Sequence, residues 1–99
     1  MRLYRKQKIG SVIQEQLAEM FTRDFDFEGT LVTIMDVEVS EDLLHALVKL
    51  GIIPYENGPE VFKDISGRRR EIQHKLLKKM NIRPMPQVEF VIEEENKAT

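Results

Sequence analysis

The sequence predicts an α+β fold with the element order helix, strand, strand, helix, helix, strand. Two kinds of periodicity predict it. Apolar residues recur every three or four positions near the start of the chain, as they do on one face of a helix. Over residues 44–50 and 88–92 they alternate with other side chains, as in strands that bury one face. We therefore expect a three-stranded sheet covered by helices on one face.

The first helix is predicted by an apolar stripe that ends where residues 24–29 break the pattern. Residues 31–39 are rich in β-branched side chains, which favours a strand. The alternation of this strand fails around Met35 and Asp36, and that failure predicts a β-bulge. The stripe of the helix consists of Ile9, Val12, Ile13, Leu17, Met20 and Phe21.

The second strand is predicted to run antiparallel to the first, after a turn at residues 40–42. Pro54 ends this strand. A short helix then follows, because Pro59 suits the first helical position and Asn57 or Gly58 can serve as its cap.

The two later helices are predicted to meet at a kink formed by Ser66 and Gly67. Glycine costs about 1 kcal/mol inside a helix, and serine can cap the helix that follows it. The second of these helices should run to about Met80, because Pro84 and Pro86 prevent its continuation. The inward residues are expected to be Val61, Phe62 and Ile65, then Ile72, Leu76 and Met80.

Length and composition predict one soluble domain over residues 1–93, followed by a short, frayed acidic tail at residues 94–99. No apolar run approaches the roughly 18 residues of a membrane span, and no apolar region follows the basic start as it would in a secretory signal. The chain contains no cysteine, which excludes disulfides and thiolate zinc sites and fits the cytoplasm.

Charge is distributed very unevenly along the chain, although the net charge is only −2. Residues 1–8 carry four cations and no acid, and residues 9–62 carry two cations against eleven acids. Residues 63–83 carry eight cations against two acids. This basic segment in an acidic chain predicts phosphate binding, to which a helix N-terminus at Gly67 would contribute. On a helical wheel Arg68, Lys75, Lys78 and Lys79 share one side, and we expect Lys75 and Lys79 to be exposed.

Further cations could extend this surface: Arg70, which lies elsewhere on the wheel, and Arg2, Arg5, Lys6 and Lys8 at the start of the chain. The alternative interpretations are a solvated helix face and a disordered, solubilising start. Arg69 points toward the apolar arc, so it must bend away or extend its charge to the surface. Tyr4 and Tyr55 could stack on bases, but a core or rim role is the commoner one. We expect the acids Asp24, Asp26, Glu28, Glu38, Glu41 and Asp42 to form a solvated acidic face.

No arrangement of residues predicts catalysis, a metal site or a cofactor. His45 and His74 are the only imidazoles, and neither has a partner at a metal-ligand spacing. A Ser-His-Asp set, a Walker loop and a GxGxxG motif are all absent from the sequence. We therefore expect a protein that is not an enzyme.

The ordered set of segments resembles the ribosome-binding factor A family. The resemblance is carried by Arg5-Lys6-Gln7-Lys8-Ile9, Val32-Thr33, Val37-Glu38-Val39-Ser40 with Asp42-Leu43, Ala46 and Val48, Ser66-Gly67 with Arg70, and residues 80–86 with Phe90. It implies a type II KH-like fold and a monomer that binds the small ribosomal subunit and its 16S rRNA. It also implies a role in late maturation near the 5′ end of that rRNA, a link to cold adaptation, and ribosomal proteins or other assembly factors as further partners.

The resemblance also implies how the RNA site departs from an ordinary KH domain. An ordinary KH domain clamps nucleotides with a Gly-x-x-Gly loop, and no two of the glycines at 10, 29, 51, 58 and 67 have that spacing. The family uses an interrupted helix, usually Ala-x-Gly, where this chain has Ile65-Ser66-Gly67. Two alternatives remain: a protein-interaction module that uses its acidic face or its sheet, and a KH-like binder of another RNA.

Overall fold

The computed structural model describes residues 2–93, and it has the predicted order of elements. The 23-residue helix α1 (Arg2–Asp24) is followed by the strands β1 (Leu31–Val39) and β2 (His45–Ile53). A 3-10 turn, η1 (Tyr55–Asn57), leads into α2 (Gly58–Gly67) and α3 (Arg69–Met80), and the last strand is β3 (Gln87–Ile92). The predicted tail at residues 94–99 lies outside the described residues.

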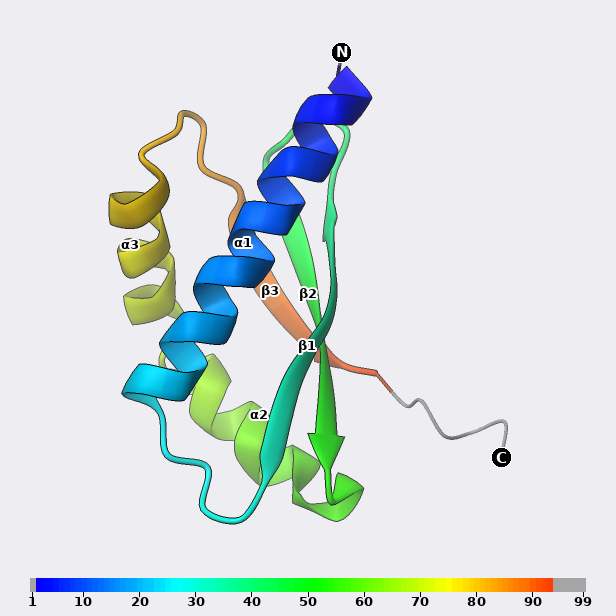
Figure 1. Cartoon of the computed structure of the whole chain (residues 1–99), viewed down its shortest axis with the longest axis vertical. Helices are drawn as coiled ribbons and strands as arrows, with labels where there is room; N and C mark the ends of the chain where they lie inside the picture. The colour runs from blue at the N-terminus through cyan, green and yellow to red at the C-terminus, as the bar shows by residue number, and fades with distance from the viewer. Residues whose placement is uncertain (1, 94–99) are drawn as a thin grey trace.

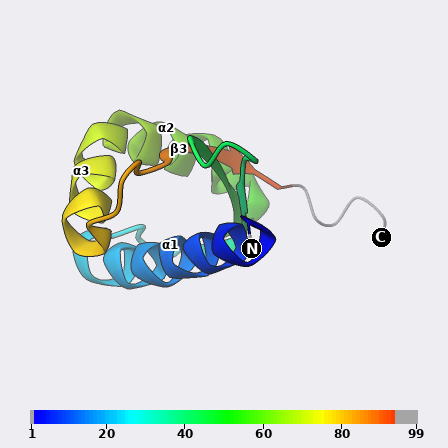
Figure 2. The same cartoon turned by 90° about the horizontal axis from the view of Figure 1, so that it is seen from above.

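The sheet has the order β1-β2-β3, so that β2 is central. β1 and β2 are antiparallel, whereas β2 and β3 are parallel. A parallel pair needs a long crossover, and here α2 and α3 provide it. The helices lie on one side of the sheet, as Figures 1 and 2 show. The expected α+β architecture with one helix-covered sheet face is therefore confirmed.

The predicted β-bulge is present at Met35. The pairing register shifts between Ile34, which lies opposite Leu50, and Asp36, which lies opposite Lys49. One extra residue reverses the alternation of faces, because side chains in a strand point to opposite faces in turn. The residues of β1 that face the helices are therefore even-numbered before the bulge and odd-numbered after it.

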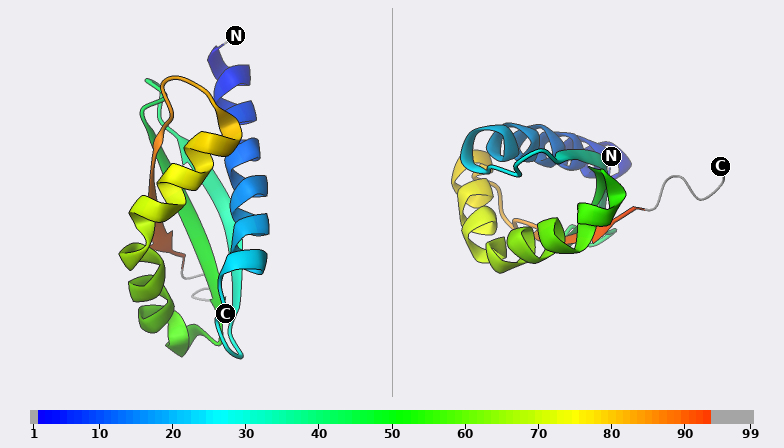
Figure 3. Two further views of the ribbon diagram at one scale, coloured as in Figure 1. Left: turned by 90° about the vertical axis from the view of Figure 1, so that its left-hand side faces the viewer. Right: turned by 90° about the horizontal axis from the view of Figure 1, so that it is seen from below.

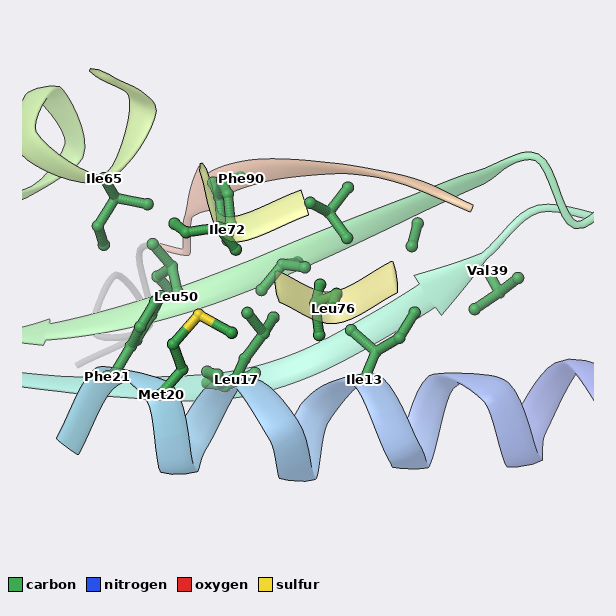
Figure 4. Close-up of a cluster of buried hydrophobic side chains, with 14 of the residues drawn as sticks. Ile13, Leu17, Met20, Phe21, Val39, Leu50, Ile65, Ile72, Leu76 and Phe90 are labelled. Carbon is green, nitrogen blue, oxygen red and sulfur yellow. The ribbon is translucent and has the colours of Figure 1, made fainter. Parts of the chain in front are cut away.

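The core lies between the sheet and the helices, and Figure 4 shows its centre. Leu17 of α1, Leu50 of β2 and Leu76 of α3 are fully buried there. Full burial of one such side chain contributes about 1.5–3 kcal/mol. The inward residues of the predicted stripes are buried except Val12 and Met80, which are half-buried, and Phe62, which is exposed. All side chains of the described residues that are buried are apolar.

The connection between α1 and β1 is held by an aromatic cluster. The ring of Phe21 makes edge contacts with Phe25 and Phe27, at centroid distances of 5.1 and 5.9 Å, and Phe25 and Phe27 stack at 5.3 Å. Gly29 then turns the chain with a φ of +77°, a conformation that side chains with a Cβ rarely adopt. This cluster fixes the end of α1 beside the junction of α2 and α3.

A candidate nucleic-acid interface on α1 and α3

The kink between α2 and α3 lies at Arg68, one residue after the predicted position. Arg68 has φ −109° and ψ 19°, and its N–H donates to the carbonyl oxygen of Ile65 at 3.1 Å. Ser66 and Gly67 still belong to α2, and the cap residue of α3 is Arg68, with no side-chain cap. The prediction that Ser66 caps α3 was therefore wrong. The interruption of the helix pair is real, but it does not need the conformational freedom of glycine.

Gly67→Ala is expected to stabilise the protein by about 0.5–1 kcal/mol, because the position is helical and nothing lies within 4 Å of the added Cβ. For a domain of this size, that corresponds to a rise of roughly 2–8 °C in the melting temperature. Thermal unfolding followed by circular dichroism measures this change. A loss of stability would contradict the helical assignment of Gly67.

Arg68 serves the structure of the kink. Its guanidinium carbon lies 3.9 Å from the centroid of the Phe25 ring, a cation–π contact. Its Nε and Nη2 donate to the two carboxylate oxygens of Glu71 at 3.3 and 3.2 Å. These contacts tie the kink to the end of α1. They also leave Arg68 only half exposed, which reduces its availability to a phosphate.

Lys75 is the centre of an ion-pair network between α1 and α3. Its ammonium lies 3.1 Å from Asp24 and 3.3 Å from Glu71. The hydrogen bond from Lys75 lowers the pKa of Asp24, and the one from Arg68, followed by that from Lys75, lowers the pKa of Glu71. Asp24 ends α1, where the helix dipole disfavours an anion, so Lys75 compensates for it. Lys75 is half-buried, contrary to the expectation of full exposure.

The stability of the protein is expected to fall as the pH drops through the pKa values of Asp24 and Glu71. The folded-state pKa of both carboxyls is depressed, so their contribution is complete above the ordinary values of 3.8 and 4.5 and is lost below them. Denaturant unfolding between pH 7 and pH 3 measures it. Lys75→Gln should be less stable at pH 7 and should show a shallower decline. An unchanged pH dependence in Lys75→Gln would show that the network contributes nothing.

A shallow cleft of about 210 Å³ lies between α1 and α3. The two helices run antiparallel, as Figure 3 shows. Gln16 and Arg23 from α1 line the cleft together with lysines from α3, and the buried Met20 forms an apolar floor. We call this feature the basic cleft, and its lining residues are Gln16, Met20, Arg23, Lys75, Lys78 and Lys79.

The cations of the basic cleft differ in their availability. Lys78 and Lys79 are exposed and form no ion pair within residues 2–93. Arg23 contacts Asp24 at 3.2 Å but keeps a side chain that is 55% exposed. Lys75 is already paired, as described above. An anion entering the cleft would therefore meet Arg23, Lys78 and Lys79 first.

The start of the chain is helical, so the alternative interpretation of a disordered start is wrong for residues 2–8. Arg5 and Lys8 are exposed. Arg5 and Arg23 are 18 residues apart, which makes about five full turns, so they lie on the same side of α1. The distance between them along the helix is roughly 27 Å. Lys6 points to the turn between β1 and β2, where its ammonium lies 3.0 Å from Glu41. Arg5 and Lys8 thus extend the basic surface along α1, whereas Lys6 fastens α1 to the hairpin.

Arg70 is not part of the cleft. Nine residues, or about two and a half turns, separate it from Lys79, so the two lie on opposite sides of α3. Arg70 is exposed on that other side. The neighbouring Arg69 donates from Nη1 to the carbonyl oxygen of Val88 at 3.2 Å. The guanidinium of Arg69 thus binds the backbone of β3. This agrees with the expectation that the Arg69 side chain must bend away from the apolar side of the helix.

The expected single acidic face is not present. Asp24 pairs with Lys75, Glu41 with Lys6, and Glu38 with Lys49 at 3.0 Å on the uncovered face of the sheet. Asp42 instead accepts a 2.6 Å hydrogen bond from Ser40 in the turn, and Asp26 accepts one from the backbone of Glu28. Three of the acids therefore lie beside lysines on different elements, and they do not share one face with the others.

Comparisons with known proteins give the same family as the sequence motifs. The profile described as RBFA: Ribosome-binding factor A matches residues 5–99.

The chain belongs to the ribosome-binding factor A family.

Ribosome-binding factor A of Pseudomonas aeruginosa (strain UCBPP-PA14) is 34% identical over 97 residues, which cover 91% of this chain and 73% of the relative. The family member of Akkermansia muciniphila is 27% identical over 90 residues, covering 91% of this chain and 72% of the relative.

Solved structures of ribosome-binding factor A proteins share the fold. The crystal structure from Thermus thermophilus has a TM-score of 0.73 at 23% identity and covers 88% of this chain and 94% of its own. The solution structure of the putative family member from Thermotoga maritima has a TM-score of 0.75 at 24% identity, covering 97% and 93%. The type II KH-like fold implied by the family resemblance is thus confirmed.

Sequence reasoning missed Arg23, the one cation that α1 contributes to the cleft opposite α3. Arg23 stands among acids and forms no motif, so only the packing of α1 against α3 reveals it.

His45 and His74 are exposed, and the described residues hold no group of three or more potential metal ligands. Tyr55 is exposed too, while the side chain of Tyr4 lies outside the described part. No helix within residues 2–93 is both long and apolar enough to cross a membrane.

Proposed function

We propose that this ribosome-binding factor A family member binds the small ribosomal subunit as an assembly factor and contacts its 16S rRNA with the basic cleft. The family assignment supports the ribosomal role. A homology model of the Thermus thermophilus relative, which has a TM-score of 0.70 to this chain at 23% identity and covers 83% of it and 88% of its own, was fitted into a cryo-EM map of a 30S–RBFA complex. The observation that carries the site is the convergence of cations from α1 and α3.

The residues of this interface divide by role. Arg23, Lys78 and Lys79 contact phosphates directly, because they are the available cations of the cleft. Arg5 and Lys8 extend the contact along α1, and Arg70 adds one on the far side of α3. The others position the surface: Arg68 and Lys75 hold α1 to α3, Lys6 holds α1 to the hairpin, and Ser66 and Gly67 lead into the kink.

Co-sedimentation tests the ribosomal role. The protein is mixed with purified small or large subunits at several salt concentrations, and the fraction in the pellet is measured. We expect binding to small subunits that weakens steeply with salt, since phosphate contacts release counterions. Equal binding to both subunits, or binding that salt does not weaken, would contradict the proposal.

The finer role that we propose is to support maturation of 16S rRNA near its 5′ end, as the family resemblance implies. The test uses bacteria that lack their own family member and express this chain. Primer extension then measures the ratio of precursor to mature 5′ ends, at normal temperature and in the cold. Restoration of mature ends supports the role. Binding to small subunits without any change in that ratio would restrict the function to binding.

A further inference from the structure

The two edges of the sheet are protected to different extents. At the β3 edge, Gln73 of α3 donates to the carbonyl oxygen of Pro86 at 2.9 Å and accepts from the N–H of Val88 at 2.8 Å. Arg69 donates to the carbonyl oxygen of Val88. Side chains of α3 thus form hydrogen bonds with the outward backbone groups at the start of β3, so another strand cannot pair with them.

The β1 edge is covered over only part of its length. The backbone of α1 at Gly10 lies so close that an added Cβ would be 3.3 Å from the carbonyl oxygen of Val37. Gln14 donates to the carbonyl oxygen of Ile34 at 3.0 Å. The backbone groups of Val32 point the same way as those of Ile34, because strand residues alternate in direction. In the described residues, no hydrogen bond outside the sheet reaches Val32.

A groove of about 490 Å³ opens beside this free part of the edge. One wall is α1, where Ala18 and Thr22 are small and exposed, and the other is β1 from Leu31 to Ile34. The aromatic cluster of Phe21, Phe25 and Phe27 closes one end. Figure 1 shows how the end of α1 and the start of β1 diverge at this place. The groove therefore combines unpaired backbone with walls of mixed apolar and polar side chains, which suits an extended peptide.

The surroundings of the groove carry negative charge. A second pocket of about 290 Å³ shares Phe27 and Thr30 with it. The carboxylates of this pocket form no ion pair within residues 2–93. A phosphate backbone would be repelled there, whereas a lysine or arginine side chain would be attracted. The four carboxylates are those of Asp26, Glu28, Glu60 and Asp64.

From these observations we infer that the free edge of β1 is a docking site for an extended basic segment of a partner protein. The segment adds a strand to the sheet by pairing with the N–H and C=O of Val32. Its alternate side chains enter the groove between α1 and β1, and a lysine or arginine reaches the acidic pocket. This protein site is separate from the basic cleft, since it uses the opposite charge and the opposite edge of α1.

The experiment uses a library of random ten-residue peptides displayed on phage and selected on the immobilised full chain. Enriched peptides are synthesised, and their binding to the ¹⁵N-labelled protein is followed by NMR. We expect the peptides to carry lysine or arginine and to shift the amide signals of Val32 and its neighbours. Failure to enrich any peptide, or shifts confined to α3, would overturn the inference. The measurement contains no ribosome, so its failure is distinct from failure of the proposed function.

Matched variants identify the backbone contact. Val32→Pro removes the outward N–H, and proline is tolerated on edge strands, whereas Val32→Ala keeps the N–H and also loses side-chain volume. We expect Val32→Pro to bind the enriched peptides at least tenfold more weakly than Val32→Ala. Equal binding by these two variants would overturn strand addition. If Val32→Pro does not fold, Ala18→Arg provides the test, because its long side chain fills the groove from an exposed position of α1. We expect Ala18→Arg to weaken binding of the enriched peptides, and unchanged binding would overturn the inference.

A further variant tests the charge of the acidic pocket. Glu60→Gln combined with Asp64→Asn keeps the shape of the pocket and removes two charges. Each enriched peptide is compared with a copy in which its lysines and arginines are replaced by glutamate. The native protein should prefer the basic copy at least tenfold, and the neutralised variant should lose most of this preference. The same preference in both proteins would show that the pocket does not read the peptide's charge.

Discussion

Lys78→Ala combined with Lys79→Ala is expected to weaken binding to the small ribosomal subunit about 25- to 60-fold at 0.1 M salt. Each phosphate contact releases about 0.7–0.9 counterions, so two lost contacts remove about 1.4–1.8 logarithmic units of affinity at that concentration. Both lysines are exposed and form no ion pair in the described residues, so their loss should leave the fold intact. Co-sedimentation over a range of salt concentrations measures the effect.

The salt dependence gives a second, independent result from the same experiment. The six proposed contacts at about 0.7 each predict a slope near −4 for log affinity against log salt, and loss of two predicts a slope near −3. Thr33→Glu combined with Gln87→Glu is the control, because it makes the same change in net charge at exposed positions of β1 and β3. If the control weakened binding as much as the lysine variant, net charge and not the basic cleft would explain the effect.

Leu76→Ala should cause the largest loss of stability among changes on α3, about 2–5 kcal/mol. Leu76 is fully buried between α3, the sheet and α1, and alanine would leave a cavity there. For a domain of this size, the loss corresponds to a fall of roughly 8–40 °C in the melting temperature. Denaturant unfolding measures the free energy of unfolding directly.

The adjacent Leu77 provides the matched control, because its side chain is 42% exposed on the same helix. Leu77→Ala should change the free energy of unfolding by no more than about 0.5 kcal/mol. Equal losses in the two variants would mean that the register of α3 on the sheet is wrong. In that case the basic cleft, which depends on this register, would have to be placed on other residues of α3.

The elements that local patterns determine were predicted from the sequence. The apolar stripe ending at Phe21 predicts α1. The failed alternation at Met35 predicts the bulge, because an extra residue in a strand reverses the order in which side chains alternate between its two faces. The prediction of a helix interruption was right as well, but its position was wrong by one residue. Glycine suggested the break, whereas the chain breaks at Arg68, whose side chain is held by Phe25 and Glu71.

Within the basic cleft, the sequence predicted the cations of α3 but not the one that α1 contributes. The sequence density of lysines indicated the α3 side, but Arg23 lies about 50 residues away among acids. The pairing of Asp24 with Lys75 was equally invisible, because an ion pair between distant helices leaves no local pattern. Tertiary packing therefore decides which cations remain available to a phosphate, and it removes Lys6 and Lys75 from those that appeared available in the sequence.

The most direct test of the basic cleft uses a single cysteine, which is unique because the chain contains none. Gln16→Cys, in the cleft, and Thr33→Cys, on the uncovered face of the sheet, are each labelled with an iron chelate that generates hydroxyl radicals. Each labelled protein is bound to small subunits, and cleavage of the 16S rRNA is mapped. We expect localised cleavage from position 16 and little from position 33. Cleavage from position 33 alone would contradict the account, because it would place the rRNA against the sheet and not against α1 and α3.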